Sequence, residues 1–289
     1  MWLVLAFIFC LLLPSEALAW GPGVHMAIGR HALEHLGAVA PAVAAVLSAH
    51  PERFLYGCLS ADILIGKGCR FTPTHSHNWS TGQLLLWQAR TLGEAAYAYG
   101  YLSHLAADVI AHNYLVPNML GFSAGQGKFS HAYVEMLADL RVEWPKASPL
   151  FRIPCGEEDA MLRTAVAQKK MPFLVKKQLF RQSLRLVEKK SYKRSLGALH
   201  GALPARKETL ILESIDFARE LVMDFLRAPR RSPALECDPI GSANLDQANS
   251  FRKRQRGYYM RHGEGIIFPL DPRLEICLRS TGACYDRVS

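Results

Sequence analysis

Several absences narrow what this 289-residue chain can be. No two cysteines form a C-x-x-C array, which argues against a zinc site built from thiolates. No apolar run reaches the ~20 residues that a transmembrane helix needs. No series of alternating apolar and polar residues indicates a β-sheet, and no internal repeat is present. We therefore expect a soluble, all-α protein.

The first nineteen residues contain no Lys or Arg but have the other parts of a signal peptide. An apolar run over residues 2–13 is followed by Ala17-Leu18-Ala19, a small-residue cleavage site. We expect removal of residues 1–19 and a secreted or periplasmic protein that begins at Trp20. An uncleaved N-terminal anchor is the alternative.

Cysteine usage agrees with export. Of seven cysteines, Cys10 lies in the leader and six remain. An even number of cysteines in an exported protein favours disulfides. Cys58 with Cys69 and Cys277 with Cys284 are the local pairs that we expect.

The formal net charge of +9 is concentrated in one segment. Within residues 169–194, Lys and Arg face a single acidic residue, Glu188, and apolar residues recur at helical spacing. This pattern indicates either the solvated face of an amphipathic helix or a surface for anionic lipid head groups or nucleic acid. Because aromatic residues are not interleaved with the charges, an anionic membrane surface is favoured over single-stranded nucleic acid.

Hydrophobic periodicity predicts a helical domain over residues 20–227, with a helix over 91–112 that is apolar on most faces and therefore central. From residue 228 the periodicity fades, and residues 228–289 are expected to form an irregular C-terminal extension of unknown role. Loops are expected over 53–82 and 113–129. The predicted helices are His25–Leu36, Thr91–His112, Ser130–Trp144, Met161–Lys190 with an interruption near Pro172, and Thr209–Leu226.

His104, Asp108 and His112 are spaced four residues apart within the central helix. Each step of four turns the helix face by about 40°, so the three side chains share one stripe. Burying them costs several kcal/mol unless they are paired or coordinated. A hydrogen-bonded His–Asp–His chain is one explanation. Because the Cα atoms of His104 and His112 are about 12 Å apart, a metal cluster bridged by the carboxylate is the other.

Further candidate ligands lie on both sides of this helix. His131 and Glu135 form a second i,i+4 pair, which could hold one zinc ion or form a surface ion pair. Asp62 is an acid in an apolar run and needs a partner, either a ligand or a local hydrogen bond. His75 and His77 point oppositely in an extended segment, so we expect only one of them to be a ligand.

Cleavage before Trp20 would create a further ligand. The free α-amine and the carbonyl of Trp20 can form a five-membered chelate around a metal ion, and His25 is close enough to add an imidazole. If the mature chain began elsewhere, His25 would be an ordinary histidine at the start of a helix.

These motifs, in this order, resemble the zinc-dependent phospholipase C family, which shares its fold with the single-strand-specific zinc nucleases. The likeness extends from residue 20 to about residue 135 and implies a mostly α-helical fold that holds three zinc ions. The motifs are Trp20-x4-His25, Ala61-Asp62-Ile63, Ser76-His77-Asn78-Trp79, His104-x3-Asp108-x3-His112 and His131-x3-Glu135.

The resemblance also implies ligand sets. The first zinc would be held by Asp62, His77, His104 and Asp108; the second by His112, His131 and Glu135; the third by the Trp20 amine and carbonyl and His25, with Asp108 as the bridge. The short Asp108-to-His112 spacing resembles the branch that includes the N-terminal domain of glycosylphosphatidylinositol-specific phospholipase D.

We therefore expect a secreted, phospholipase C-like hydrolase of phosphodiester bonds, in which zinc activates water and Asp62 also orients or deprotonates it. Its substrate would be a phospholipid or another phosphodiester. An exported single-strand nuclease is the first alternative, with Trp79 and Tyr114 as candidate base-stacking residues. A zinc-binding protein without turnover is the second.

Overall fold

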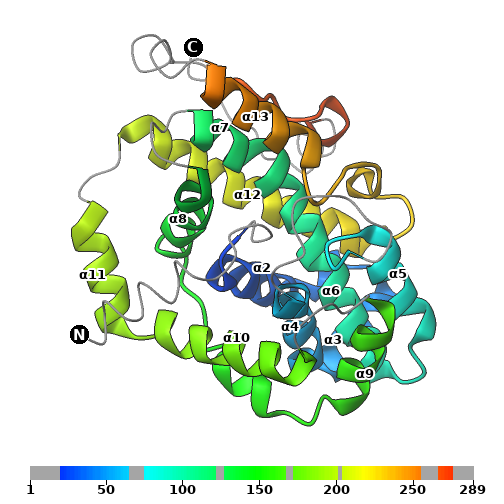
Figure 1. Cartoon of the computed structure of the whole chain (residues 1–289). Coiled ribbons are helices and arrows are strands. Elements are labelled where there is room, and N and C mark those ends of the chain that lie inside the picture. The colour runs from blue at the N-terminus through cyan, green and yellow to red at the C-terminus, as the bar shows by residue number, and fades with distance from the viewer. Residues whose placement is uncertain are drawn as a thin grey trace.

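The computed structural model describes residues 20–64, 75–121, 127–166, 172–200, 204–254 and 266–275 (Figure 1). Within these ranges every regular element is a helix, which confirms the predicted all-α class. The predicted signal peptide lies outside them. No helix in the described ranges combines the length and the apolar character needed to cross a bilayer.

Helix α6 (Leu92–Ile110) is the centre of the molecule, as its apolar faces predicted. It begins with a capping box, in which the Thr91 hydroxyl accepts a hydrogen bond from the Glu94 amide and the Glu94 carboxylate accepts from the Thr91 amide. Other helices surround it (Figure 1). They are α2 (Pro22–Glu34), α3 (Pro41–Ala49), α4 (Pro51–Ser60), α5 (Trp79–Gln88) and α12 (Ala205–Arg227).

The predicted helix over 161–190 is two helices, α9 (Gly156–Ala165) and α10 (Phe173–Val187). The interruption near Pro172 is thus confirmed, because proline has no amide hydrogen to continue a helix. Helix α8 (Gly127–Asp139) ends before the predicted Trp144. Further elements are η1 (Leu36–Ala38), η4 (Ser148–Arg152) and α11 (Lys190–His200).

The prediction of a loop over residues 53–82 is wrong for much of its length, because α4, the short helix η2 (Ala61–Leu64) and α5 lie there. Gly57 reads as a loop residue, but it faces Gly100 where α4 crosses α6. A Cβ on Gly57 would lie 3.0 Å from the Gly100 Cα, and one on Gly100 would lie 2.9 Å from the Cys58 amide nitrogen. The absence of side chains at this crossing lets the two backbones touch.

The chain changes pitch where α6 ends. A π-helical turn, η3 (Ala111–Leu115), leads into α7 (Val116–Gly121), so the predicted loop from residue 113 is partly helical. The C-terminal region adds η5 (Pro233–Glu236) and α13 (Ser242–Arg254), a helix that the fading periodicity did not predict. Helix α13 packs against η3 and α7.

Three cysteines lie in the described ranges, Cys58, Cys155 and Cys237; all are buried, and no two of them form a disulfide with each other. The other members of the expected disulfides, Cys69, Cys277 and Cys284, lie outside the part of the chain that the structure describes. The two disulfides therefore stay predictions.

Candidate metal centre

Four of the predicted ligands converge beside α6. His104 and Asp108 lie on successive turns of this helix, with His104 Nε2 3.1 Å from Asp108 Oδ2. Asp62 comes from η2, and His77 from the turn before α5. His77 Nε2 lies 3.2 Å from Asp62 Oδ1 and 3.4 Å from Asp108 Oδ2. All four residues are at most 2% exposed.

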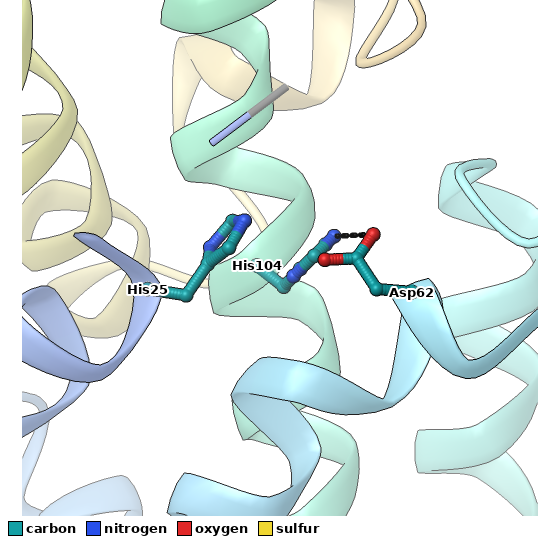
Figure 2. A group of neighbouring side chains, drawn as sticks. All are labelled: His25, Asp62 and His104. Carbon is teal, nitrogen blue, oxygen red and sulfur yellow. Dashed lines mark ion pairs between the residues drawn. The ribbon is translucent and has the colours of Figure 1, made fainter. Parts of the chain in front are cut away.

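His25 reaches the same place from α2. Its ring stacks on that of His104, with centroids 3.8 Å apart, and its Nε2 lies 3.4 Å from Asp108 Oδ1. Figure 2 shows His25 and Asp62 approaching His104 from opposite sides, with the ion pair of 3.7 Å between His104 and Asp62 dashed. Asp108 thus has its two carboxylate oxygens near different imidazoles.

The donor atoms fit a bound cation. Two sets of three lie within 4.8 Å of one another: those of His25, Asp62 and His104, and those of His77, His104 and Asp108. Several of these atoms are buried without a hydrogen-bond partner, an expensive arrangement unless a positive ion compensates it. They are His25 Nε2, Asp62 Oδ1 and both carboxylate oxygens of Asp108.

The neighbouring groups orient the imidazoles. His104 Nδ1 lies 2.9 Å from the Cys58 carbonyl oxygen, which can only accept a hydrogen bond. Nδ1 therefore donates, and Nε2 faces the centre, the arrangement usual for a metal-binding histidine. His77 Nδ1 lies 3.1 Å from the Ser76 hydroxyl, and the Tyr101 hydroxyl donates to the Ser76 carbonyl.

His75 has a different place from His77. The His77 amide donates to His75 Nδ1 at 3.0 Å, and the His75 carbonyl accepts from the Thr81 hydroxyl at 2.9 Å. His75 belongs to neither set of convergent donor atoms among the described residues. The structure thus brings His77 into a set of convergent donor atoms, whereas His75 accepts a hydrogen bond from the His77 backbone.

Burial and the charges of neighbouring groups shift the pKa values within this cluster. Burial raises the pKa of Asp62 to about 6, although the charges of His104 and His25 oppose the shift. Burial acts to lower the pKa of His104, but the carboxylates of Asp108 and Asp62 outweigh it and raise the pKa to about 9. Burial also acts on Asp108, yet its pKa is held well below the usual range by His104 and His25. His104 and Asp108 thus favour each other's charged forms.

The remaining predicted ligands belong to neither convergent set among the described residues. His112, on η3, is buried and outside both convergent sets, with Nδ1 2.6 Å from the Pro239 carbonyl oxygen. Glu135, on α8, is 3% exposed. Burial, together with the charges of Asp62, Asp139 and Asp108, raises its pKa well above the usual value. The side chain of His131 lies outside what the structure describes.

Trp20 is completely buried and lies against the helical turn that carries Asp108. Its indole Nε1 donates to the Ala107 carbonyl at 2.8 Å. Sequence reasoning missed how this segment is held. The Asp139 carboxylate, from α8, accepts hydrogen bonds of 2.9 Å from the amides of Gly23 and Val24 and so caps α2. Its position four residues after Glu135, on the same face of α8, was the available signal.

Comparison with known proteins gives one match. Residues 24–164 match the family model of zinc dependent phospholipase C. No curated protein and no solved structure matches the chain significantly. The matched range contains all the candidate ligands except Trp20, and the buried His and Asp groups within it are of the kind that holds zinc. Residues 24–164 of this chain belong to the zinc-dependent phospholipase C family.

Proposed function

We propose that this protein is a secreted zinc-dependent hydrolase of phosphodiester bonds, phospholipase C-like in its substrate. The observation that carries the proposal is the convergence of His25, Asp62, His77, His104 and Asp108 in the core, with several donor atoms that lack hydrogen-bond partners. The match to a family of zinc-dependent phospholipases supports it.

Three zinc ions would be shared among nine residues. When bound, zinc supplies a Lewis acid for phosphate oxygens and makes bound water more acidic. The first set of ligands is Asp62, His77, His104 and Asp108; the second is His112, His131 and Glu135; the third is the amine and carbonyl of Trp20 with His25, to which Asp108 is the bridge.

The protein side chains have separate tasks in this proposal. Asp62 orients or deprotonates the attacking water. Asp108 would act as the bridging ligand, with one carboxylate oxygen for each of two neighbouring zinc sites. His104 is fixed by the Cys58 carbonyl, so its Nε2 keeps its direction.

The nuclease alternative needs exposed aromatic platforms near the site. Both candidates are buried. Trp79 is 8% exposed, donates its indole hydrogen to the Cys237 carbonyl and packs near Phe225, and Tyr114 is 5% exposed. These contacts support packing roles for both residues and leave neither of them as a platform for base stacking.

The assay that tests the proposal uses zinc-loaded protein on three substrates: phosphatidylcholine, phosphatidylinositol and single-stranded DNA. We expect release of a phosphorylated head group from at least one lipid. Cleavage of the DNA alone would favour the nuclease. Stoichiometric zinc binding without turnover of any substrate would support the alternative of a zinc-binding protein that is not an enzyme.

Export would create the third site. The small-residue motif Ala17-Leu18-Ala19 supports a mature chain that starts at Trp20. N-terminal sequencing of the exported protein should therefore begin at Trp20, and this form should bind one more zinc equivalent than a form with an added N-terminal Met. Equal zinc content in the two forms would remove Trp20 from the ligands.

We also propose that α10 meets an anionic membrane surface. It lies beside η2, which carries Asp62, and it exposes Leu174 and Val175 at 70% and 45% next to basic residues. Part of the charge is used internally, because Lys177 pairs with Asp159 at 2.6 Å. Leu174→Ser with Val175→Ser should weaken co-sedimentation with vesicles that contain phosphatidylglycerol, whereas Leu212→Ser, an exposed position on α12, should not.

A further inference from the structure

A C-terminal segment wraps around the end of α6. Residues 237–244, here called the clasp, lie outside the part of the chain that matches the family, yet they bond to residues inside it. Trp79 Nε1 donates to the Cys237 carbonyl at 2.8 Å, and Asn113 Nδ2 donates to the Asp238 carbonyl at 2.7 Å. Asn244 Nδ2 donates to the Asn113 carbonyl at 3.1 Å.

The clasp determines how the His112 ring is presented. The Pro239 carbonyl oxygen lies 2.6 Å from His112 Nδ1. Because a carbonyl only accepts, Nδ1 carries the hydrogen, and the lone pair of the neutral ring is on Nε2. A backbone carbonyl on one ring nitrogen is the usual means of directing the other toward a metal.

The shape of the clasp is specified by its own residues. Gly241 has a φ of 60°, in the left-handed region that favours glycine. A Cβ on Gly241 would lie 2.6 Å from the His112 Cβ and 2.7 Å from its carbonyl carbon, so no larger residue fits. The Asp238 carboxylate closes the turn by accepting from the amides of Ile240 and Ser242, at 2.9 and 3.0 Å.

The clasp also engages the π-helical turn η3, on which His112 lies. Asn113 Nδ2 bonds to the Val109 carbonyl of α6 as well as to Asp238. One side chain therefore connects the helix, the widened turn and the clasp. This connection makes the direction of His112 depend on a segment more than a hundred residues away in sequence.

We propose that the clasp is a positioning element for the second zinc site, which orients His112 Nε2 toward the metal through the Pro239 carbonyl. The inference rests on the proposed function, in which His112 is a zinc ligand. It assigns a role to part of a C-terminal region whose sequence suggested none.

The test compares two glycine substitutions in the full chain. Gly241→Ala puts a methyl group against His112, whereas Gly156→Ala, at the start of α9, meets no atom within 4 Å. Zinc titration of metal-free protein should show one equivalent weakened by ~10- to 100-fold in Gly241→Ala, with the other equivalents unchanged. Gly156→Ala should match the parent protein. Unchanged affinity for every equivalent in a folded Gly241→Ala protein would overturn the proposal.

One further variant keeps the test decisive if Gly241→Ala does not fold. Asn244→Ala removes only the side-chain bonds to Asn113 and should weaken the same equivalent to a smaller extent. Normal zinc binding in Asn244→Ala would contradict a role of the clasp through these contacts.

A readout without metal separates this proposal from the proposed function. In the metal-free protein, nitrogen NMR shifts should show the hydrogen of neutral His112 on Nδ1, and Asn244→Ala should mix the two tautomers. If the protein bound no zinc, the proposed function would fail, whereas the tautomer would still report whether the clasp orients the ring. A hydrogen on His112 Nε2 in the parent protein would by itself overturn the proposal that the clasp orients the ring.

Discussion

The two histidine positions of the central helix are supported in different ways. At His104, imidazoles and carboxylates from four segments meet, with imidazole nitrogens 3.1 to 3.4 Å from carboxylate oxygens. At His112, the helix has widened into a π-turn, and the ring is held by a backbone carbonyl of the clasp. We call these the His104 end and the His112 end.

The carboxylates also differ from one another. The adjacent imidazoles hold the pKa of Asp108 well below its usual range, although burial opposes them. The pKa of Glu135, on α8, is instead raised well above its usual value by burial and by the charges of Asp62, Asp139 and Asp108. The charged form of Asp108 is thus favoured by its neighbours, whereas burial and its neighbours both disfavour the charged form of Glu135.

The largest effect is expected from removing the residue that joins the sites. Asp108→Ala should lose more than one equivalent of zinc, and activity should fall by ~10³-fold or more, because both carboxylate oxygens face imidazoles of the cluster. Asp108→Asn is the control of similar shape. Zinc analysis and lipid hydrolysis measure the two effects. Full activity with unchanged metal content would break the description of Asp108 as a shared ligand.

The next prediction separates a ligand from its support at the His104 end. His77→Ala should lose one zinc equivalent. His75→Ala should keep the full number and bind one of them up to ~10-fold more weakly, because His75 accepts a hydrogen bond from the His77 amide. Zinc titration of the two variants makes the comparison. The reverse ranking would assign the ligand to His75.

A smaller effect is expected where α8 holds α2. Asp139→Ala removes the acceptor for the amides of Gly23 and Val24 and should lower the free energy of unfolding by ~1 kcal/mol. It should also weaken the zinc site that includes His25. Asp139→Asn keeps one acceptor oxygen and should lose less. Equal urea midpoints for Asp139→Ala and the parent protein would show that this cap is not needed.

The smallest effect concerns pH and lies away from both ends. Burial, His35 and Arg219 lower the pKa of His31 to about 4, despite the opposing charges of Glu34 and Asp216. The unfolded chain takes up this proton first, at its ordinary pKa of about 6.5, so stability falls as the pH drops from about 6.5 to about 4.

His31→Gln should remove this contribution, which is ~0.5 kcal/mol or less because the ring is half-exposed. Urea unfolding of metal-free protein at pH 7 and pH 4.5 measures it. If the parent and the variant lost the same stability between these pH values, the pH response would belong to other groups and not to His31.

Much of the fold and of the His104 end could be predicted from the sequence. The spacing of His104 and Asp108 already placed both side chains on one face of a buried helix, and the apolar faces of residues 91–112 identified that helix as central. The choice between His75 and His77 needed coordinates, because it depends on how one short turn is folded.

The rest depended on contacts between distant segments. Gly57 lies in a segment predicted as a loop and Gly100 within the predicted central helix, and their small size serves a helix crossing that neither prediction contains. The π-turn after Ile110 and the carbonyl of Pro239 leave no periodic signal, because a backbone group contributes the same atoms whatever the residue. Helix α13 has mainly polar residues, so its apolar spacing was too weak to predict it.

The crossing of Gly57 and Gly100 has a consequence for natural variation. Cys58, whose carbonyl orients His104, directly follows Gly57. The distance between the two helices at the crossing therefore affects where that carbonyl lies relative to the His104 ring. A single methyl group at either glycine would lift one helix off the other and rotate the ring, although it touches no ligand. Loss of function at these two positions should therefore resemble a ligand defect, with the damage transmitted by the backbone alone.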